Sequence, residues 1–85
     1  MIYSVILKTC GSHYYPLCGI PSERKYTASI EECQRRVREY ISRYNLSSDN
    51  WNGGQVYDGL GEYIGKISYT GYFVRGWHTQ QNDLY

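Results

Sequence analysis

The chain has little of what would assign it to a specialised class of protein. It contains no run of about 18 apolar residues, which a membrane-spanning helix needs, and no secretory leader pattern follows Met1. Its formal net charge is only +1, which indicates neither a strongly basic nucleic-acid binder nor an acidic DNA-like coat. We therefore expect a soluble, cytoplasmic protein without membrane contacts.

Cysteine is scarce and odd in number. With three cysteines and no secretory signal, a disulfide framework is not expected. Cys10, His13 and Cys18 have the side-chain chemistry of zinc ligands, and Cys33 or His78 would complete a tetrahedral site. Their spacing, C-x2-H-x4-C, matches no common zinc signature, so metal binding by these residues stays an open alternative.

The signals of catalysis are also missing. Gly53, Gly54, Gly59 and Gly61 fall in turns between predicted strands, where no helix dipole and no array of amides would hold a phosphate. A Cys-His nucleophile would need an oriented base, for which the sequence has no cue. We therefore expect a protein that is not an enzyme and that uses no cofactor or metal.

What the chain does have is tyrosine, with eleven in 85 residues. Tyrosine is enriched at binding surfaces because it offers a large rigid area with a polar tip. It also fills half-buried positions of small sheets, so this observation alone leaves both interpretations open. The length fits a single domain over residues 1–85, which buries roughly 60–65% of its unfolded surface.

The clearest element begins at Ser29, because Ser29-x-x-Glu32 is a capping box. Apolar side chains then recur at helical spacing and form one stripe: Ile30, Cys33, Val37, Tyr40, Ile41 and Tyr44. Asn45 favours a left-handed cap that ends the helix. The opposite face carries charged pairs four residues apart, among which Arg36 and Arg38 have the least internal need.

The rest of the chain predicts strands and one long loop. Residues 2–8 are apolar on both sides, as in an inner strand, whereas residues 9–26 show no sustained period and predict a loop, or in part a short strand around Tyr14. Residues 55–58 predict a short strand and residues 63–77 a pair of strands. Because the helix must bury its stripe, we predict a two-layer α+β domain of order β-α-β-β-β, with one amphipathic helix on a mainly antiparallel four-stranded sheet.

The segment 63–77, YIGKISYTGYFVRGW, reads as a hairpin with a two-residue turn at Thr70-Gly71. This turn pairs Lys66 with Arg75 and places them beside Phe73 and Trp77, on the face turned away from the helix. Two like charges in register need water or a shared anion. Rings beside cations are typical of nucleic-acid platforms and of protein interfaces.

We therefore predict two groups of partner-binding residues. The first group is the hairpin face: Lys66, Phe73, Arg75 and Trp77. The second group lies on the helix and in the long loop: Arg36, Arg38, Tyr14 and Tyr15.

The chain also resembles, in pattern, small proteins of bacteriophages and mobile elements that combine a Ser-x-Glu-Glu helix start with W-x-G-G, V-x-D and I-S-Y-x-G. The matching positions are Ser29, Glu31, Glu32, Trp51, Gly53, Gly54, Val56, Asp58, Ile67, Ser68, Tyr69 and Gly71. Some anti-CRISPR proteins have this size and helix-on-sheet layout. The resemblance implies a non-enzymatic inhibitor that binds a CRISPR effector complex, a protein or ribonucleoprotein of the host cell, and blocks recognition of target nucleic acid.

Two alternatives remain beside the anti-CRISPR interpretation. One is a small nucleic-acid-binding module that uses the same basic and aromatic sheet face. The other is a small zinc-dependent or cysteine-dependent protein. The near-neutral charge argues against an inhibitor that mimics DNA with an acidic surface.

Overall fold

The computed structural model of the chain describes residues 2–9 and 20–76. Its elements are β1 (Tyr3–Leu7), β2 (Glu23–Thr27), α1 (Ile30–Arg43), a 3₁₀ helix η1 (Ser48–Asn50), β3 (Gln55–Tyr57), β4 (Tyr63–Ile67) and β5 (Phe73–Arg75). The α+β class is confirmed, but the predicted number of four strands is wrong, because the described residues alone form a five-stranded sheet. In this part of the chain no helix combines the length and the apolar content that a membrane crossing requires.

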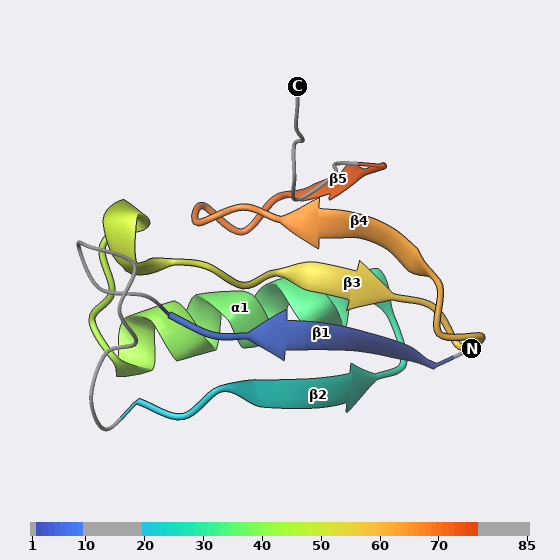
Figure 1. The fold of residues 1–85 in the computed structure, drawn as a ribbon, viewed down its shortest axis with the longest axis horizontal. Coiled ribbons are helices and arrows are strands. Elements are labelled where there is room, and N and C mark those ends of the chain that lie inside the picture. The colour runs from blue at the N-terminus through green and yellow to red at the C-terminus, as the bar shows by residue number, and fades with distance from the viewer. Residues whose placement is uncertain (1, 10–19, 77–85) are drawn as a thin grey trace.

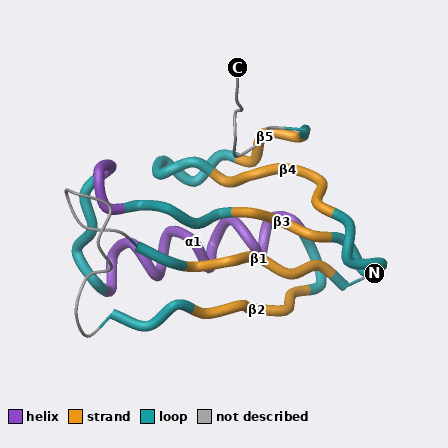
Figure 2. Tube along the Cα trace, in the orientation of Figure 1, coloured by secondary structure: helices purple, strands orange, loops and turns teal. Residues whose placement is uncertain are grey.

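The strands form one antiparallel sheet in the order β2-β1-β3-β4-β5. The helix α1 lies behind this sheet in Figure 1, and Figure 2 shows the same two layers in the tube. We call the side of the sheet toward α1 the inner face and the opposite side the outer face. Among the described elements, none lies on the outer face (Figure 1).

Strand β2 lies in the segment for which the sequence predicts a loop. Its residues, ERKYT, lack apolar alternation because β2 is an edge strand with charged residues at inner-face positions. Glu23 and Lys25 form an ion pair there at 3.2 Å, and Thr27 is the buried member of the set. Since the sequence signal for a strand is hydrophobic periodicity, this strand gives almost none.

The helix α1 begins and ends where the sequence predicts. Ser29 is its N-cap and accepts a hydrogen bond from the Glu32 amide at 3.1 Å. The reciprocal bond of the capping box is displaced by one residue, because the Glu32 carboxylate accepts from the Ala28 amide at 3.3 Å. After Arg43, Asn45 has a φ of 53°, which confirms the predicted left-handed residue at this end.

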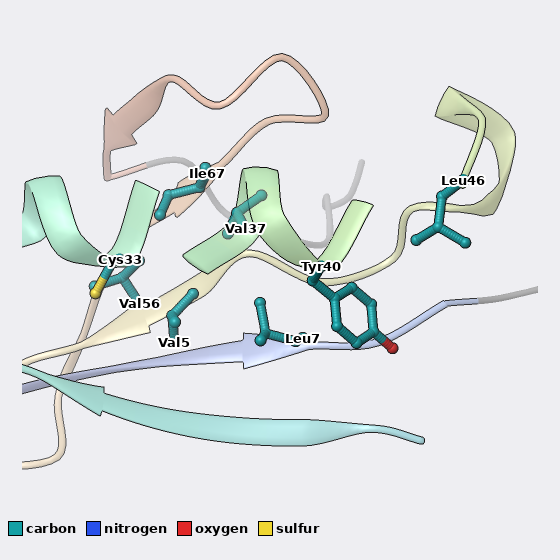
Figure 3. Packing of buried hydrophobic residues seen from close by; sticks show 8 residues of the cluster. All are labelled: Val5, Leu7, Cys33, Val37, Tyr40, Leu46, Val56 and Ile67. Atoms are coloured by element: carbon teal, nitrogen blue, oxygen red, sulfur yellow. The ribbon is translucent and has the colours of Figure 1, made fainter. Parts of the chain in front are cut away.

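The apolar stripe of α1 packs on the inner face and forms the core (Figure 3). Its buried members are Val5, Leu7, Cys33, Val37, Tyr40, Leu46, Val56 and Ile67. Burying a side chain such as Val5 or Ile67 contributes about 1.5–3 kcal/mol. The hydroxyl of Tyr40 donates to the Pro21 carbonyl at 2.7 Å, so the largest core side chain carries no unpaired polar group.

The connection from α1 to β3 seals one end of this core. Trp51 packs beside Tyr40, with ring centroids 6.0 Å apart, and its Nε1 donates to the Ile67 carbonyl at 3.1 Å. Gly54 has a φ of 97° and bonds Ile6 on one side and Ile67 on the other. A Cβ at Gly54 would collide with the Ile67 carbonyl, which explains the glycine at this bend.

The hairpin between β4 and β5 differs from the prediction in its loop. Gly71 donates to the Ser68 carbonyl and Ser68 donates to the Tyr72 carbonyl, both at 2.9 Å, so three residues form the loop instead of two. Gly71, with a φ of 93°, takes the left-handed position that a three-residue loop requires. The register consequently moves by one residue, and Lys66 lies opposite Val74.

Contacts with α1 hold this loop in place. The Gln34 side chain donates to the Gly71 carbonyl at 3.0 Å. A Cβ on Gly71 would come within 3.0 Å of the Arg38 side chain, so the loop lies close against the helix. The register of the hairpin therefore depends on tertiary contacts as well as on its own turn residues.

Candidate binding face

The hairpin register separates the two cations that the sequence predicts to lie together. Lys66 lies opposite Val74 on the outer face, whereas Arg75 lies opposite Gly65 on the inner side. A shift of one residue turns the side chains of one strand over relative to its neighbour. The prediction of a Lys66–Arg75 pair on one face, beside Phe73, is therefore wrong.

Two of the predicted residues do meet, on the inner side at the edge of the sheet. Arg75 Cζ lies 5.6 Å from the centroid of the Phe73 ring. Phe73 packs against the core, and its ring covers Gly65, where a Cβ would come within 2.7 Å of it. Phe73 thus closes the core edge. Three other predicted residues lie outside the described part of the chain: Trp77, Tyr14 and Tyr15.

The two predicted arginines of α1 differ from each other. Arg36 is half-buried and forms ion pairs with Glu32 at 3.5 Å and Glu39 at 3.8 Å, so the expectation that it has little internal role is wrong. Arg38 is exposed and lies beside Gly71. Since α1 covers the inner face, neither arginine belongs to the outer face.

The outer face carries a row of three tyrosines and one serine across four strands. The register places Tyr26 opposite Ser4, Ser4 opposite Tyr57, and Tyr57 opposite Tyr63. Tyr26 is 69% exposed, whereas Ser4 is 4% exposed. The small buried serine therefore leaves a gap in the row between the rings of Tyr26 and Tyr57.

A β-bulge turns Tyr63 toward this row. Val56 pairs with Gly65, but the next residue, Tyr57, pairs with Tyr63, so Ile64 is the extra residue. Regular alternation along β4 would instead put Tyr63 on the face of Gly65. The rings of Tyr57 and Tyr63 lie edge to face, 5.8 Å apart at 67°. The pKa of the Tyr63 hydroxyl is raised, mainly by burial and to a smaller extent by the nearby Tyr57.

Arg24 lies over the gap in the row. Its Nη1 donates to Ser4 Oγ at 3.0 Å, and its Cζ is 5.1 Å from the centroid of the Tyr57 ring. A cation over a ring at a solvent-accessible site contributes about 0.5–1 kcal/mol, and Tyr57 is partly exposed. Because a guanidinium has five N–H donors, Arg24 can keep its place over Tyr57 and still donate to a ligand.

The charge of the outer face is positive. Lys8, Arg24 and Lys66 are its charged residues, and the outer-face positions of the described strands hold no carboxylate. Asp58 and Glu62 lie beside the face, in the turn between β3 and β4. The pKa of Lys66 is lowered, mainly by burial and to a smaller extent by the positive charge of Lys8. The two ammonium groups therefore repel each other, and a bound anion would relieve that repulsion.

A hollow of about 190 Å³ opens at the end of the sheet where β1 begins. A single water needs only about 10–15 Å³. The hollow lies between Arg24 and Tyr26 of β2 on one side and Asp58 and Gly61 of the β3–β4 turn on the other, with Ser4 between them. The Asp58 Oδ1 accepts from the amides of Leu60 and Glu62 at 2.9 and 3.0 Å, which fixes this turn.

Cys33 is the one cysteine in the described residues, and its surroundings can be compared with the hypothesis of a zinc-dependent or cysteine-dependent protein. Cys33 is buried, and its Sγ lies 3.0 Å from Thr27 Oγ1. Burial raises the pKa of the thiol, which disfavours the reactive thiolate. Within residues 2–9 and 20–76 no three His, Cys, Asp or Glu side chains are grouped to hold a metal. Cys10, His13 and Cys18 lie outside the described residues.

The sequence interpretation missed most of the outer face. Arg24 and Tyr26 belong to the strand that reads as a loop, and Tyr63 reaches the face only through the bulge. The spacing of two between Arg24 and Tyr26 is a weak signal, because alternate residues of a strand share a face. Among the predicted partner-binding residues in the described chain, Lys66 is the one that the structure places on the outer face.

Comparisons with known proteins identify no relative: no family model, curated protein or solved structure matches the chain. The class of domain is therefore described from the structure alone. It is a small α+β domain whose sheet is covered by one helix on the inner face and carries tyrosines and cations on the outer face.

Proposed function

We propose that the protein is a non-enzymatic binding protein of the anti-CRISPR type, encoded by a phage or mobile element. It binds a CRISPR effector complex in the host cytoplasm through the outer face of its sheet and blocks recognition of target nucleic acid. The outer face is the observation that supports a binding role, since it combines exposed tyrosine and arginine, the residue types that dominate interface energetics. The choice of target is supported by the pattern resemblance.

The structure changes which residues we expect to make this contact. Tyr26 and Arg24 are exposed members of the outer face, and Lys66 and Lys8 supply further positive charge. Phe73 and Arg75 are replaced in this role because they lie on the inner side at the β5 edge. Tyr26 is a suitable first target for mutation, since 69% of its surface is exposed and its loss should leave the core intact.

The test is an interference assay in bacteria that carry an active CRISPR system and a matched target phage or plasmid. Expression of the chain should restore infection or plasmid uptake. The double variant Tyr26→Ala with Arg24→Ala should lose this protection, whereas Tyr72→Ala with Arg43→Ala should retain it. The control pair matches the test pair in residue types, and Tyr72 is 70% exposed.

A pull-down with the tagged chain should recover an effector complex from the same cells, and the Tyr26→Ala, Arg24→Ala variant should recover less of it. The proposal is overturned if the wild-type chain gives no protection against any CRISPR type tested. Equal protection by the outer-face variant and the control variant would remove the outer face from the mechanism.

A further inference from the structure

Two members of the row Tyr26–Ser4–Tyr57–Tyr63, Tyr26 and Ser4, line the 190 Å³ hollow, which we call the slot. Neighbouring strands lie about 4.7–4.9 Å apart, so Tyr26 and Tyr57, which are two strands apart, rise from backbones roughly 9–10 Å apart. Ser4 lies between them and is 4% exposed, and the Arg24 guanidinium that donates to it occupies the Tyr57 side of the space. The 190 Å³ hollow occupies this end of the sheet, bounded by Tyr26 on β2.

The slot is lined by the groups that a nucleotide uses. Bases stack on aromatic rings and on arginine planes. Arg24 lies over Tyr57 at 5.1 Å and is held by Ser4, so a ring entering beside Tyr26 would meet a guanidinium that is already positioned. Asp58, on the far wall, offers a carboxylate acceptor of the kind that bonds the amino group of a base.

The charges along the outer face, beyond the slot, favour an anionic chain over a protein surface. Arg24 and Lys66 occupy outer-face positions of the described strands, which hold no carboxylate, and Lys8 directly follows β1. Asp58 is the carboxylate that lines the hollow. Lys8 and Lys66 lie close enough to repel each other, so a phosphate passing between them would be attracted by both. A ligand that supplies planar rings and regularly spaced negative charges together is a single-stranded nucleic acid.

We infer that the outer face binds single-stranded nucleic acid, with one base between Tyr26 and the Arg24 guanidinium that covers Tyr57, and with the backbone phosphates along Arg24, Lys8 and Lys66. The inference rests on the proposed function only in taking the outer face as the working surface. Within that function it names the part of the target that is bound: an exposed strand of guide or target nucleic acid. A duplex is excluded from the slot because its bases are paired and stacked inside the helix.

The first experiment measures binding of the full-length chain to fluorescent single-stranded RNA and DNA oligonucleotides by anisotropy, with the corresponding duplexes in parallel. The single strands should bind and the duplexes should bind more weakly. Each phosphate neutralised should contribute about −0.7 to the slope of log K against log salt, so three cations predict a slope near −2.

The second experiment separates the slot from general surface effects. Tyr26→Ala should weaken single-strand binding about 5- to 100-fold, the range expected for loss of one base–aromatic stack. Tyr72→Ala, which removes an equally exposed tyrosine, should change binding by less than about twofold. Tyr72 directly follows the β4–β5 loop, and that loop lies at the end of the sheet opposite the β3–β4 turn (Figure 1).

A matched pair of arginines tests the cations. Arg24 lies over Tyr57 at 5.1 Å and Arg43 lies over Tyr44 at 6.0 Å, so Arg24→Ala and Arg43→Ala each remove an exposed cation from a tyrosine ring. Arg24→Ala should weaken binding and reduce the salt slope by about 0.7, whereas Arg43→Ala should do neither. Lys8→Gln should reduce the slope by a similar amount.

The inference is overturned if no oligonucleotide binds more tightly than about 10⁻⁴ M at physiological salt, the weak end of non-specific binding. It is also overturned if duplexes bind as well as single strands, or if Tyr26→Ala and Tyr72→Ala have equal effects. Recovery of an effector complex through Tyr26 by a chain that binds no oligonucleotide would overturn this inference and support the proposed function. Oligonucleotide binding that depends on Tyr26, without protection in cells, would support this inference and count against the proposed function.

Discussion

The inner and outer faces of the sheet use the same residue type for different purposes. Tyr40, on the helix that covers the inner face, is 2% exposed, and its hydroxyl donates a hydrogen bond to the Pro21 carbonyl. Tyr26, on the outer face, is 69% exposed. The difference shows that tyrosine occupies both the packed core and the exposed face of this sheet. Substitutions on the inner side should therefore change the free energy of unfolding, and substitutions on the outer face should change binding.

The largest expected contrast is between Tyr40 and Tyr26. Tyr40→Ala should lower the free energy of unfolding by about 3–5 kcal/mol, because it opens a cavity in the core. Tyr26→Ala should change it by less than about 0.5 kcal/mol, because the side chain is mostly in water. Urea unfolding followed by circular dichroism measures both.

Tyr40→Phe is the milder variant in case Tyr40→Ala fails to fold. It removes the hydrogen bond to Pro21 while keeping the ring, and it should cost about 1 kcal/mol. A stability loss for Tyr26→Ala comparable to that of Tyr40→Phe would mean that the outer face is part of the packed structure, and the contrast between the faces would fail.

Two glycines with similar backbone angles give the next contrast. Gly54 has a φ of 97° and faces the Ile67 carbonyl, while Gly61 has a φ of 85° and nothing within 4 Å of the position of a Cβ. Gly61→Ala should cost about 1–2 kcal/mol for left-handed strain alone. Gly54→Ala should cost about 1–3 kcal/mol more, because the added methyl group also overpacks the core. Equal losses in urea unfolding would show that the connection adjusts freely around Gly54.

The buried thiol of Cys33 gives a smaller, pH-dependent contrast. Its pKa lies above the ordinary 9.0, mainly because of burial. As the pH rises, the folded chain therefore keeps this proton after the unfolded chain begins to lose it. The unfolded state then binds fewer protons, and the contribution of this thiol to stability falls as the pH rises through about 9. The stability difference between wild type and Cys33→Ala should therefore shift against the wild type between about pH 8 and pH 10. A difference that stays constant in urea unfolding over this range would contradict the raised pKa.

The smallest expected effect is on Lys66 of the outer face. Its pKa is lowered by burial first and by Lys8 second, so Lys8→Gln should raise it without restoring the ordinary 10.5. Lys25→Gln is the control, because Lys25 is paired with Glu23 on the inner side and should leave the pKa of Lys66 unchanged. Titration of the lysine side chains by NMR measures the shift. If Lys8→Gln had no more effect than Lys25→Gln, the proximity of Lys8 and Lys66 would be disproved.

The elements that the sequence predicts correctly are those with strong local signals. Ser29 and Glu32 mark the start of α1, Asn45 marks its end, and the apolar residues on both sides of residues 2–8 indicate an inner strand. Each of these signals is contained within a few neighbouring residues. Local chemistry therefore sufficed for the helix, for β1 and for the α+β class.

The outer face was mispredicted because its geometry depends on long-range contacts. Thr70-Gly71 fits a two-residue turn or the end of a three-residue loop, and contacts of Gln34 and Arg38 with Gly71 accompany the longer one. That difference of one residue places Arg75 on the inner face, whereas Lys66 lies on the outer face. The bulge at Ile64 in β4 has a similar effect on Tyr63, and the neighbouring Gly65 is only a weak local marker of it.

The charged edge strand β2 has one more consequence. An open sheet edge exposes rows of unpaired amides and carbonyls on which another chain can add a strand, and lysines and other charges along the edge oppose that addition. Glu23, Arg24 and Lys25 give β2 three consecutive charges, so stacking a second molecule in register would place like charges next to each other. The charged residues that remove the hydrophobic strand signal from β2 therefore also disfavour edge-to-edge association of the folded protein into fibrils.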